Sequence, residues 1–141
     1  MNVLIDTPLW SLAFRRSRDA LAITERQLVD ELADLVRRDE ALMLGVIRQE
    51  ILSGIREPAT FRALQARLAA FEDVLISTAD QESAAECFNQ CRRNGVTGAL
   101  ADMLICAVSM RLKVAILTTD KDFISYSRYI PIKLRGIRRV G

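Results

Sequence analysis

The sequence contains no histidine. This absence excludes a Ser-His or Cys-His catalytic pair, a histidine general base and a histidine-ligated zinc ion. Any acid-base chemistry must therefore depend on carboxylates, on lysines or on water bound to a metal ion. Carboxylates are plentiful, because 18 of the 141 residues are Asp or Glu.

Cysteine and long apolar runs are also scarce. The three cysteines are an odd number, and a chain of this length needs no disulfide framework. Cys87 and Cys91 lie four residues apart, and we expect them and Cys106 to pack in the core of a protein from a reducing compartment. The longest runs without a charged residue have eight residues, as in Met103–Met110, which is too short to span a bilayer. The first residues do not show the basic segment followed by a long apolar segment that is typical of a secretion signal. We therefore expect a cytoplasmic protein without a membrane partner.

The composition is that of an ordinary globular protein. Half of the residues are apolar and 27% are charged, so we expect residues 1–141 to form a single domain with its own core. The net charge is +2. If four acids gather in one pocket, 14 remain on the rest of the surface against 20 cations. That balance mildly favours a polyanionic partner.

Short apolar runs rich in branched residues predict buried strands. The candidates are Val3–Ile5, Ala41–Gly45, Val74–Ile76, Val114–Leu117 and an edge strand within Tyr129–Leu134. Segments with helical spacing of apolar residues separate them. Strands that alternate with helices predict a central, mainly parallel sheet of about five strands, covered on both faces and joined by right-handed crossovers. The expected fold class is an α/β protein with three α/β/α layers.

Capping signals predict where several helices begin and end. Thr7-Pro8 reads as an N-cap followed by a proline in the first turn, and Thr24 and Thr78 each have a Gln three residues later, as in a capping box. Asn94-Gly95 is a stop signal. Further helices are expected through Ile47–Ile55, through Phe61–Phe71, from Leu100 to Met110 and, as a short turn, from Asp122.

Several acids fall at one edge of this predicted sheet. Asp6 follows the first strand, Asp120 follows the run Val114–Leu117, and Asp122 comes two residues later. Asp102 lies in the first turn of its helix, and Glu50 lies on the helix after the second strand. Ligands bind at the carboxyl ends of strands in such sheets, so these side chains are candidates for one site. Each of them alone could equally be a helix cap, a turn residue or a solvent-facing side chain.

Carboxylates that converge repel one another unless protons or cations neutralise them. Oxygen ligands without histidine favour Mg²⁺ or Mn²⁺. These ions typically activate water and stabilise displacement at phosphorus. The pattern therefore predicts metal-dependent phosphoryl chemistry.

Four motifs also carry a family resemblance. They are Val3-Leu-Ile-Asp-Thr-x-x-Trp10, Gln49-Glu-Ile-Leu-Ser-Gly54, Gly98-x-x-x-Asp-x-x-Ile-x-Ala107 and Leu117-Thr-Thr-Asp-x-Asp-Phe123. Together they resemble a PIN domain of the VapC toxin type over the whole chain. The resemblance implies a PIN-like α/β/α sandwich and an endoribonuclease dependent on Mg²⁺ or Mn²⁺. It also implies the toxin half of a toxin-antitoxin pair, with a cognate antitoxin and a homodimer or hetero-oligomer as assemblies.

The resemblance also assigns residues. The catalytic and metal-binding acids would be Asp6, Glu50, Asp102 and Asp120, supported by Thr7, Thr118 and Asp122. A metal-activated water would then hydrolyse an RNA phosphodiester bond. Many relatives have Asn or Ser at the position that is Pro8 here, so this position is not expected to bind metal or substrate.

Two groups of cations could guide RNA, or could simply be solvated surface. They are Arg15, Arg16 and Arg18, and, near the end of the chain, Arg128, Lys133, Arg135, Arg138 and Arg139. Apolar residues around the first two helices could exceed what a small core holds and form a surface for an antitoxin helix or a second copy. They are Trp10, Leu12, Phe14, Leu28, Leu32 and Leu35.

Two other functions remain open from the sequence. A phosphatase of the haloacid-dehalogenase type would use Asp6 as a covalent nucleophile, although Pro8 stands where that family has a second Asp. A binding module without catalysis could use the acids to hold a basic peptide. A dinucleotide-binding domain is excluded, because no glycine-rich loop follows the first strand.

Overall fold

The structure is a computed structural model and describes residues 1–136. Four parallel strands form one sheet in the order β2-β1-β3-β4. The strands are β1 Val3–Ile5, β2 Ala41–Leu42, β3 Ala115–Leu117 and β4 Leu134–Arg135. The helices are α1 Thr7–Arg15, a 3-10 turn Arg18–Ala20, α2 Ile23–Arg37, α3 Gly45–Leu52, α4 Pro58–Leu68, α5 Thr78–Arg93, α6 Leu100–Leu112 and α7 Asp122–Ser127. The α/β class with a parallel sheet is confirmed.

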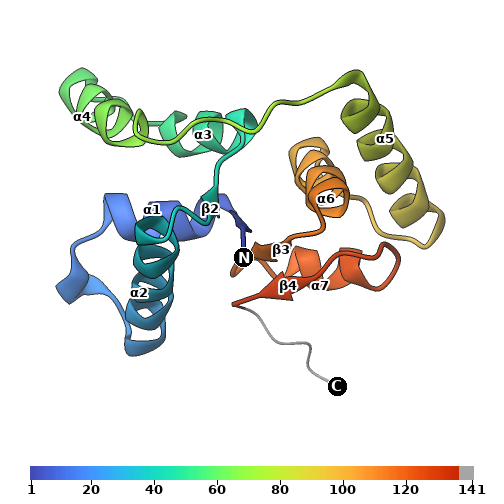
Figure 1. The fold of residues 1–141 in the computed structure, drawn as a ribbon, viewed down its shortest axis with the longest axis horizontal. Helices are drawn as coiled ribbons and strands as arrows, with labels where there is room; N and C mark the ends of the chain where they lie inside the picture. Colours follow the sequence, from blue (N-terminus) through green and yellow to red (C-terminus); the bar gives the residue numbers. More distant parts are fainter. Residues whose placement is uncertain (137–141) are drawn as a thin grey trace.

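Helices cover both faces of the sheet (Figure 1). The α1 and α2 helices pack together on one side of the strands, and α5 and α6 pack together on the other. Right-handed crossovers account for this division. The chain passes from β1 to its neighbour β2, and then returns past β1 to its other neighbour, β3, so the two connections lie on opposite faces of the sheet. The order of strands therefore reverses between β1 and β3. Ligand sites in open parallel sheets lie at such a reversal.

One predicted strand does not form. Residues 74–76 are irregular, and the chain there touches the sheet only at a parallel bridge between Met43 and Asp73. A strand buried on two faces needs apolar partners on both, but the Leu75 side chain is 89% exposed. Arg48 also holds the preceding turn, because its guanidinium pairs with the Asp73 carboxylate at 2.9 Å and donates to the carbonyl of Leu68 at 2.8 Å. The sheet has four strands as a result.

The first helix begins one residue earlier than predicted. Asp6, not Thr7, is its N-cap, and the Asp6 carboxylate accepts a hydrogen bond from the Thr7 amide at 2.8 Å. Pro8 still lies in the first turn. An aspartate that caps α1 is therefore held with its side chain at the carboxyl end of β1.

The two predicted capping boxes also shift toward the N-terminus. Ala22 caps α2, and the Glu25 carboxylate accepts from its amide at 2.9 Å. Ser77 caps α5 and exchanges hydrogen bonds with Asp80. In both helices a carboxylate at the third helical position accepts the hydrogen bond from the N-cap amide. The sequence had predicted a glutamine in this role. The predicted stop at Asn94 is confirmed, followed by Gly95 at φ 81°.

The core buries half of the six apolar residues that were considered for a partner surface. Trp10 is fully buried, and its indole N–H donates to the carbonyl of Ile5 at 3.0 Å. Leu32 and Leu35 are buried as well, whereas Leu12, Phe14 and Leu28 are partly exposed. The three cysteines are unpaired and buried, as predicted. Within residues 1–136, no helix has the length and apolar character needed to cross a membrane.

Candidate active site

Asp6 lies at the point where the order of the strands reverses. Its carboxylate is only 4% exposed, and both of its oxygens accept hydrogen bonds. One bond comes from the Thr7 amide at 2.8 Å and the other from the Thr118 hydroxyl at 2.8 Å. Burial raises the pKa of Asp6 from 3.8 to about 6, and the nearby charges of Asp102 and Glu50 add to the rise, although both hydrogen bonds oppose it.

Thr118 joins the ends of β1 and β3. Its side chain is fully buried. The hydroxyl oxygen accepts a hydrogen bond from the Asp120 amide at 2.9 Å, and the same hydroxyl donates a hydrogen bond to the Asp6 carboxylate. The Asp120 carboxylate in turn accepts from the Asp122 amide at 2.9 Å, which caps the turn before α7. The interpretation of Asp120 as a turn residue is therefore correct, and it is compatible with a place in the site.

Asp102 enters the site from α6, in the first turn of the helix as predicted. One oxygen from each of Asp102, Asp120 and Asp122 lies within 4.8 Å of the others. Burial raises the pKa of Asp102, and the charges of Asp120, Glu50 and Asp122 raise it further. Three carboxylates from two helix starts thus converge in a small volume.

Glu50 completes the group from α3. Its carboxylate is solvent-exposed and accepts from the Thr7 hydroxyl at 3.1 Å. Its charge acts on both Asp6 and Asp102. The structure therefore brings together all seven residues that the resemblance had singled out. They are Asp6, Thr7, Glu50, Asp102, Thr118, Asp120 and Asp122.

The five carboxylates have no cationic partner in the described part of the chain. Another buried aspartate shows the usual alternative. Asp80 is 2% exposed, and the Arg111 guanidinium, 2.7 Å away, holds the pKa of that carboxyl below its usual value. Asp6 is buried to a similar degree and its pKa moves in the opposite direction. The difference marks the acids near Asp6 as a candidate site for an added cation.

The donor set fits a hard divalent metal ion. Every candidate ligand is a carboxylate oxygen, which suits Mg²⁺ or Mn²⁺ and does not suit a thiolate- or imidazole-binding metal. Thr118 and Thr7 orient Asp6 and Glu50 by hydrogen bonds from their hydroxyls. Such outer contacts fix the direction in which a ligand oxygen points.

Sequence reasoning missed the contact of Tyr126 with the site. Tyr126 lies on α7, is 3% exposed, and its hydroxyl donates to the Asp102 carboxylate at 2.7 Å. This hydrogen bond lowers the pKa of Asp102 against the effects of burial. No motif indicates the contact, because it depends on how α7 packs against α6.

Replacing Tyr126 with Phe should weaken Mn²⁺ binding about tenfold, because losing the hydrogen bond raises the pKa of Asp102 and frees its carboxylate to rotate. Calorimetric titration with Mn²⁺ measures the change, and raising the pH should recover part of the affinity. Tyr129→Phe is the matched control, since Tyr129 lies outside the site. Equal Mn²⁺ affinities for the two variants would contradict this role for Tyr126.

Half of the described residues in the predicted basic clusters form ion pairs. Arg16 pairs with Glu25, Arg18 with Asp30, and Arg135 with Glu31. Arg138 and Arg139 lie outside the described residues. Arg15, Arg128 and Lys133 form no ion pair with any residue in 1–136.

Comparison with known proteins agrees with this geometry. The PIN domain family profile matches residues 3–129. The VapC ribonuclease Mb1587 of Mycobacterium bovis and the ribonuclease VapC11 of Mycobacterium tuberculosis are each 29% identical over 138 residues, which cover 96% of this chain and 99% of each relative.

Solved structures share the fold. FitAcB from Neisseria gonorrhoeae superposes with a TM-score of 0.73 at 17% identity, over 94% of this chain and 95% of the other. VapBC2 from Rickettsia felis, solved with a DNA fragment from its promoter, gives a TM-score of 0.74 at 14% identity, over 96% and 98%. The arrangement of layers is therefore shared with these structures. The family profile spans the acids from Asp6 to Asp122. The chain belongs to the PIN domain family.

Proposed function

We propose that this protein is a metal-dependent endoribonuclease and the toxin component of a toxin-antitoxin pair, with residues 1–141 acting as a single domain. The observation that carries the proposal is the set of five carboxylates at the reversal of the strand order, none of which is paired with a described cation. The relatives named as VapC ribonucleases match nearly the full chain and support the same activity.

Asp6, Asp102 and Asp120 would bind the metal, with Glu50 and Asp122 bound directly or through water. A bound Mg²⁺ or Mn²⁺ supplies an activated water molecule and stabilises negative charge that develops at phosphorus. The protein itself would hold the reacting phosphate at the edge of the sheet. Thr118 keeps Asp6 oriented and fixes the turn that carries Asp120.

A phosphatase with Asp6 as covalent nucleophile is less compatible with the sequence. That reaction needs a general acid near the nucleophile. Pro8 cannot provide that acid.

The partners follow from the same proposal. The substrate is RNA, and the inhibitor is a cognate antitoxin, as the FitAB and VapBC2 assemblies among the structural neighbours suggest. A homodimer is the expected assembly of the toxin. The three unpaired cysteines fit a reducing cytoplasm.

The test is cleavage of a cellular RNA pool by the purified protein with Mg²⁺, with Mn²⁺ or with EDTA, followed by sequencing of the cut ends. We expect cutting with either ion, none with EDTA, and 5′-phosphate ends. A dominant cut site would name the RNA target. Absence of cutting by protein shown to be free of a bound inhibitor would favour a binding module without catalysis.

A further inference from the structure

A groove lies along one face of α1, beside residues that adjoin the acid site in the chain. It has a volume of about 640 Å³, which lies within the range of natural ligand sites. Pro8 and Thr119 line the end beside the acids, and Ser11, Leu12 and Arg15 continue along α1. Positions 8, 11, 12 and 15 share one helical face, so the groove follows α1 for about two turns. We call it the α1–α2 groove, since α2 forms its other wall.

The groove combines apolar and polar surfaces. Leu12 from α1 and Leu28 from α2 are both partly exposed in it. The hydroxyls of Ser11 and Thr24 offer hydrogen-bond donors and acceptors. Glu25, the one acid in the lining, is already engaged, because it accepts from the Ala22 amide and lies 3.7 Å from Arg16.

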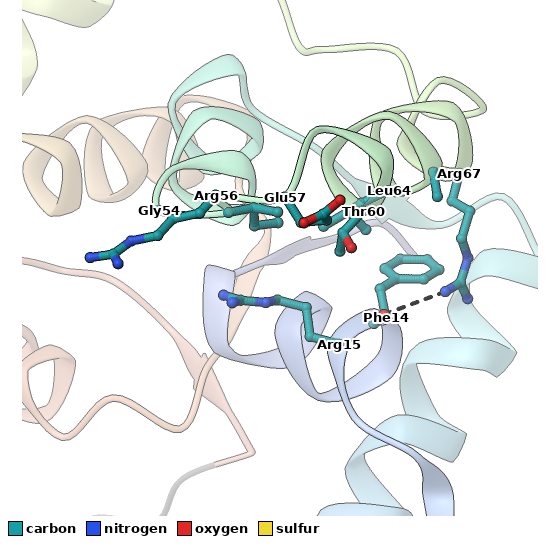
Figure 2. Close-up of a pocket in the computed structure, with 10 residues that line it drawn as sticks. Phe14, Arg15, Gly54, Arg56, Glu57, Thr60, Leu64 and Arg67 are labelled. Atoms are coloured by element: carbon teal, nitrogen blue, oxygen red, sulfur yellow. Dashed lines mark hydrogen bonds between the residues drawn. The ribbon is translucent and has the colours of Figure 1, made fainter.

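Arg15 gives this groove a cation without an ion-pair partner in the described part of the chain. It is exposed and has no ion-pair partner among residues 1–136, whereas its neighbours Arg16 and Arg18 do. Arg15 also lines a second pocket, shown in Figure 2, between α1 and α4. Arg15 and Arg56 extend in the same direction there, while Arg67 lies against the Phe14 ring at 4.3 Å. Within residues 1–136, neither Arg15 nor Arg56 forms an ion pair with an acid, so both charges are free to act on a ligand.

We propose that the α1–α2 groove holds single-stranded RNA on one side of the scissile bond, with Arg15 bound to a backbone phosphate. The inference rests on the ribonuclease function proposed above. An α-helix rises 1.5 Å per residue, so Arg15 stands about 14 Å along α1 from Asp6, a few nucleotides from the reacting phosphate. Leu12 and Leu28 give riboses and bases an apolar wall, and the hydroxyls can bond to phosphate or to the 2′-OH.

Position and charge favour RNA over a protein segment as the occupant. The strand being cut must leave the acid site along the surface, and two residues of the groove lining, Pro8 and Thr119, directly adjoin site residues in the chain. The acids repel phosphates near the site in the absence of metal, so a cation beyond their reach has to supply attraction. Arg15 is placed to do so.

The test is binding of a fluorescent single-stranded polyuridine oligonucleotide to the full chain at several salt concentrations, in an Asp6→Asn background to prevent cutting. Arg15→Gln should weaken binding roughly three- to tenfold and reduce the slope of log K against log salt by about 0.7, as expected for one lost phosphate contact to a single strand. Arg18→Gln is the matched control, because Asp30 already engages Arg18, and it should change neither quantity.

Introducing charges of opposite sign at one groove position separates an electrostatic effect on binding from misfolding, because misfolding would weaken binding in both variants. Ser11→Lys should tighten polyuridine binding and Ser11→Glu should weaken it, since Ser11 lies on the same face of α1 as Arg15. Equal effects of Arg15→Gln and Arg18→Gln, or a shift of the same sign for both Ser11 variants, would overturn the proposal. So would an Arg15→Gln variant that binds RNA normally but loses affinity for the purified antitoxin, which would assign the groove to a protein. Failure of the ribonuclease function itself would appear separately, as an inactive wild type in the cleavage assay.

Discussion

Asp6→Asn is expected to abolish RNA cleavage and, without metal, to stabilise the fold. Loss of a metal-binding carboxylate should slow cleavage by about three orders of magnitude or more, equivalent to about 4 kcal/mol in the barrier. The fold should gain roughly 1–3 kcal/mol at pH 7, because the substitution removes a buried negative charge that faces Asp102 and Glu50. Asn can still cap α1, and its amide still has Thr118 as a hydrogen-bond partner.

Asp80→Asn is the matched control for this variant. Asp80 is buried to a similar degree but pairs with Arg111, so its substitution should lower the melting temperature and leave Mg²⁺-dependent cleavage intact. Thermal unfolding in EDTA and cleavage rates in Mg²⁺ measure the two effects. An Asp6→Asn protein that cuts RNA at the wild-type rate would show that Asp6 is not a metal ligand in the reaction.

The metal-free protein should lose stability as the pH rises from about 4 to about 7. The pKa of Asp6 is raised from 3.8 to about 6 in the folded state, so the folded protein binds a proton more tightly than the unfolded chain does. The free energy of unfolding therefore falls as this proton is lost, by about 3 kcal/mol from Asp6 alone. Asp102 acts in the same direction. Carboxyls with lowered pKa values, such as Asp80, affect stability only below about pH 4.

Urea unfolding in EDTA across this pH range measures the effect, and saturating Mg²⁺ should suppress it by neutralising the same carboxylates. Asp6→Asn is the control and should show a much weaker pH dependence than the wild type. A free energy of unfolding that rises between pH 4 and 7 in EDTA would contradict the raised pKa of Asp6.

The acids of the site could be predicted because each is tied to a local signal. Asp6 and Asp120 follow buried strands, and the carboxyl ends of parallel strands share one edge of the sheet. Asp102 lies in a first helical turn that the apolar spacing located correctly. Local signals of this kind persist whatever the rest of the chain does.

Features that depend on packing between distant segments could not be predicted. The contact of Tyr126 with Asp102 joins α7 to α6, and the ion pairs of Arg16 and Arg18 need partners from α2. The apolar run at residues 74–76 looks like a strand, but Leu75 finds no second face to pack against. The α2 and α5 helices begin earlier than predicted, because the carboxylates of Glu25 and Asp80, rather than glutamines, complete their capping boxes.

Anomalous diffraction from crystals of the wild-type protein soaked with Mn²⁺ tests the central claim most directly. The account predicts a manganese peak among the site carboxylates, where Asp102, Asp120 and Asp122 converge and the Asp102 charge acts on Asp6. The same peak should be absent from crystals of Asp6→Asn. A metal at this position would place the reaction at the reversal of the strand order. Saturating Mn²⁺ with no peak among these carboxylates, or a peak only elsewhere on the surface, would contradict the assignment of the site.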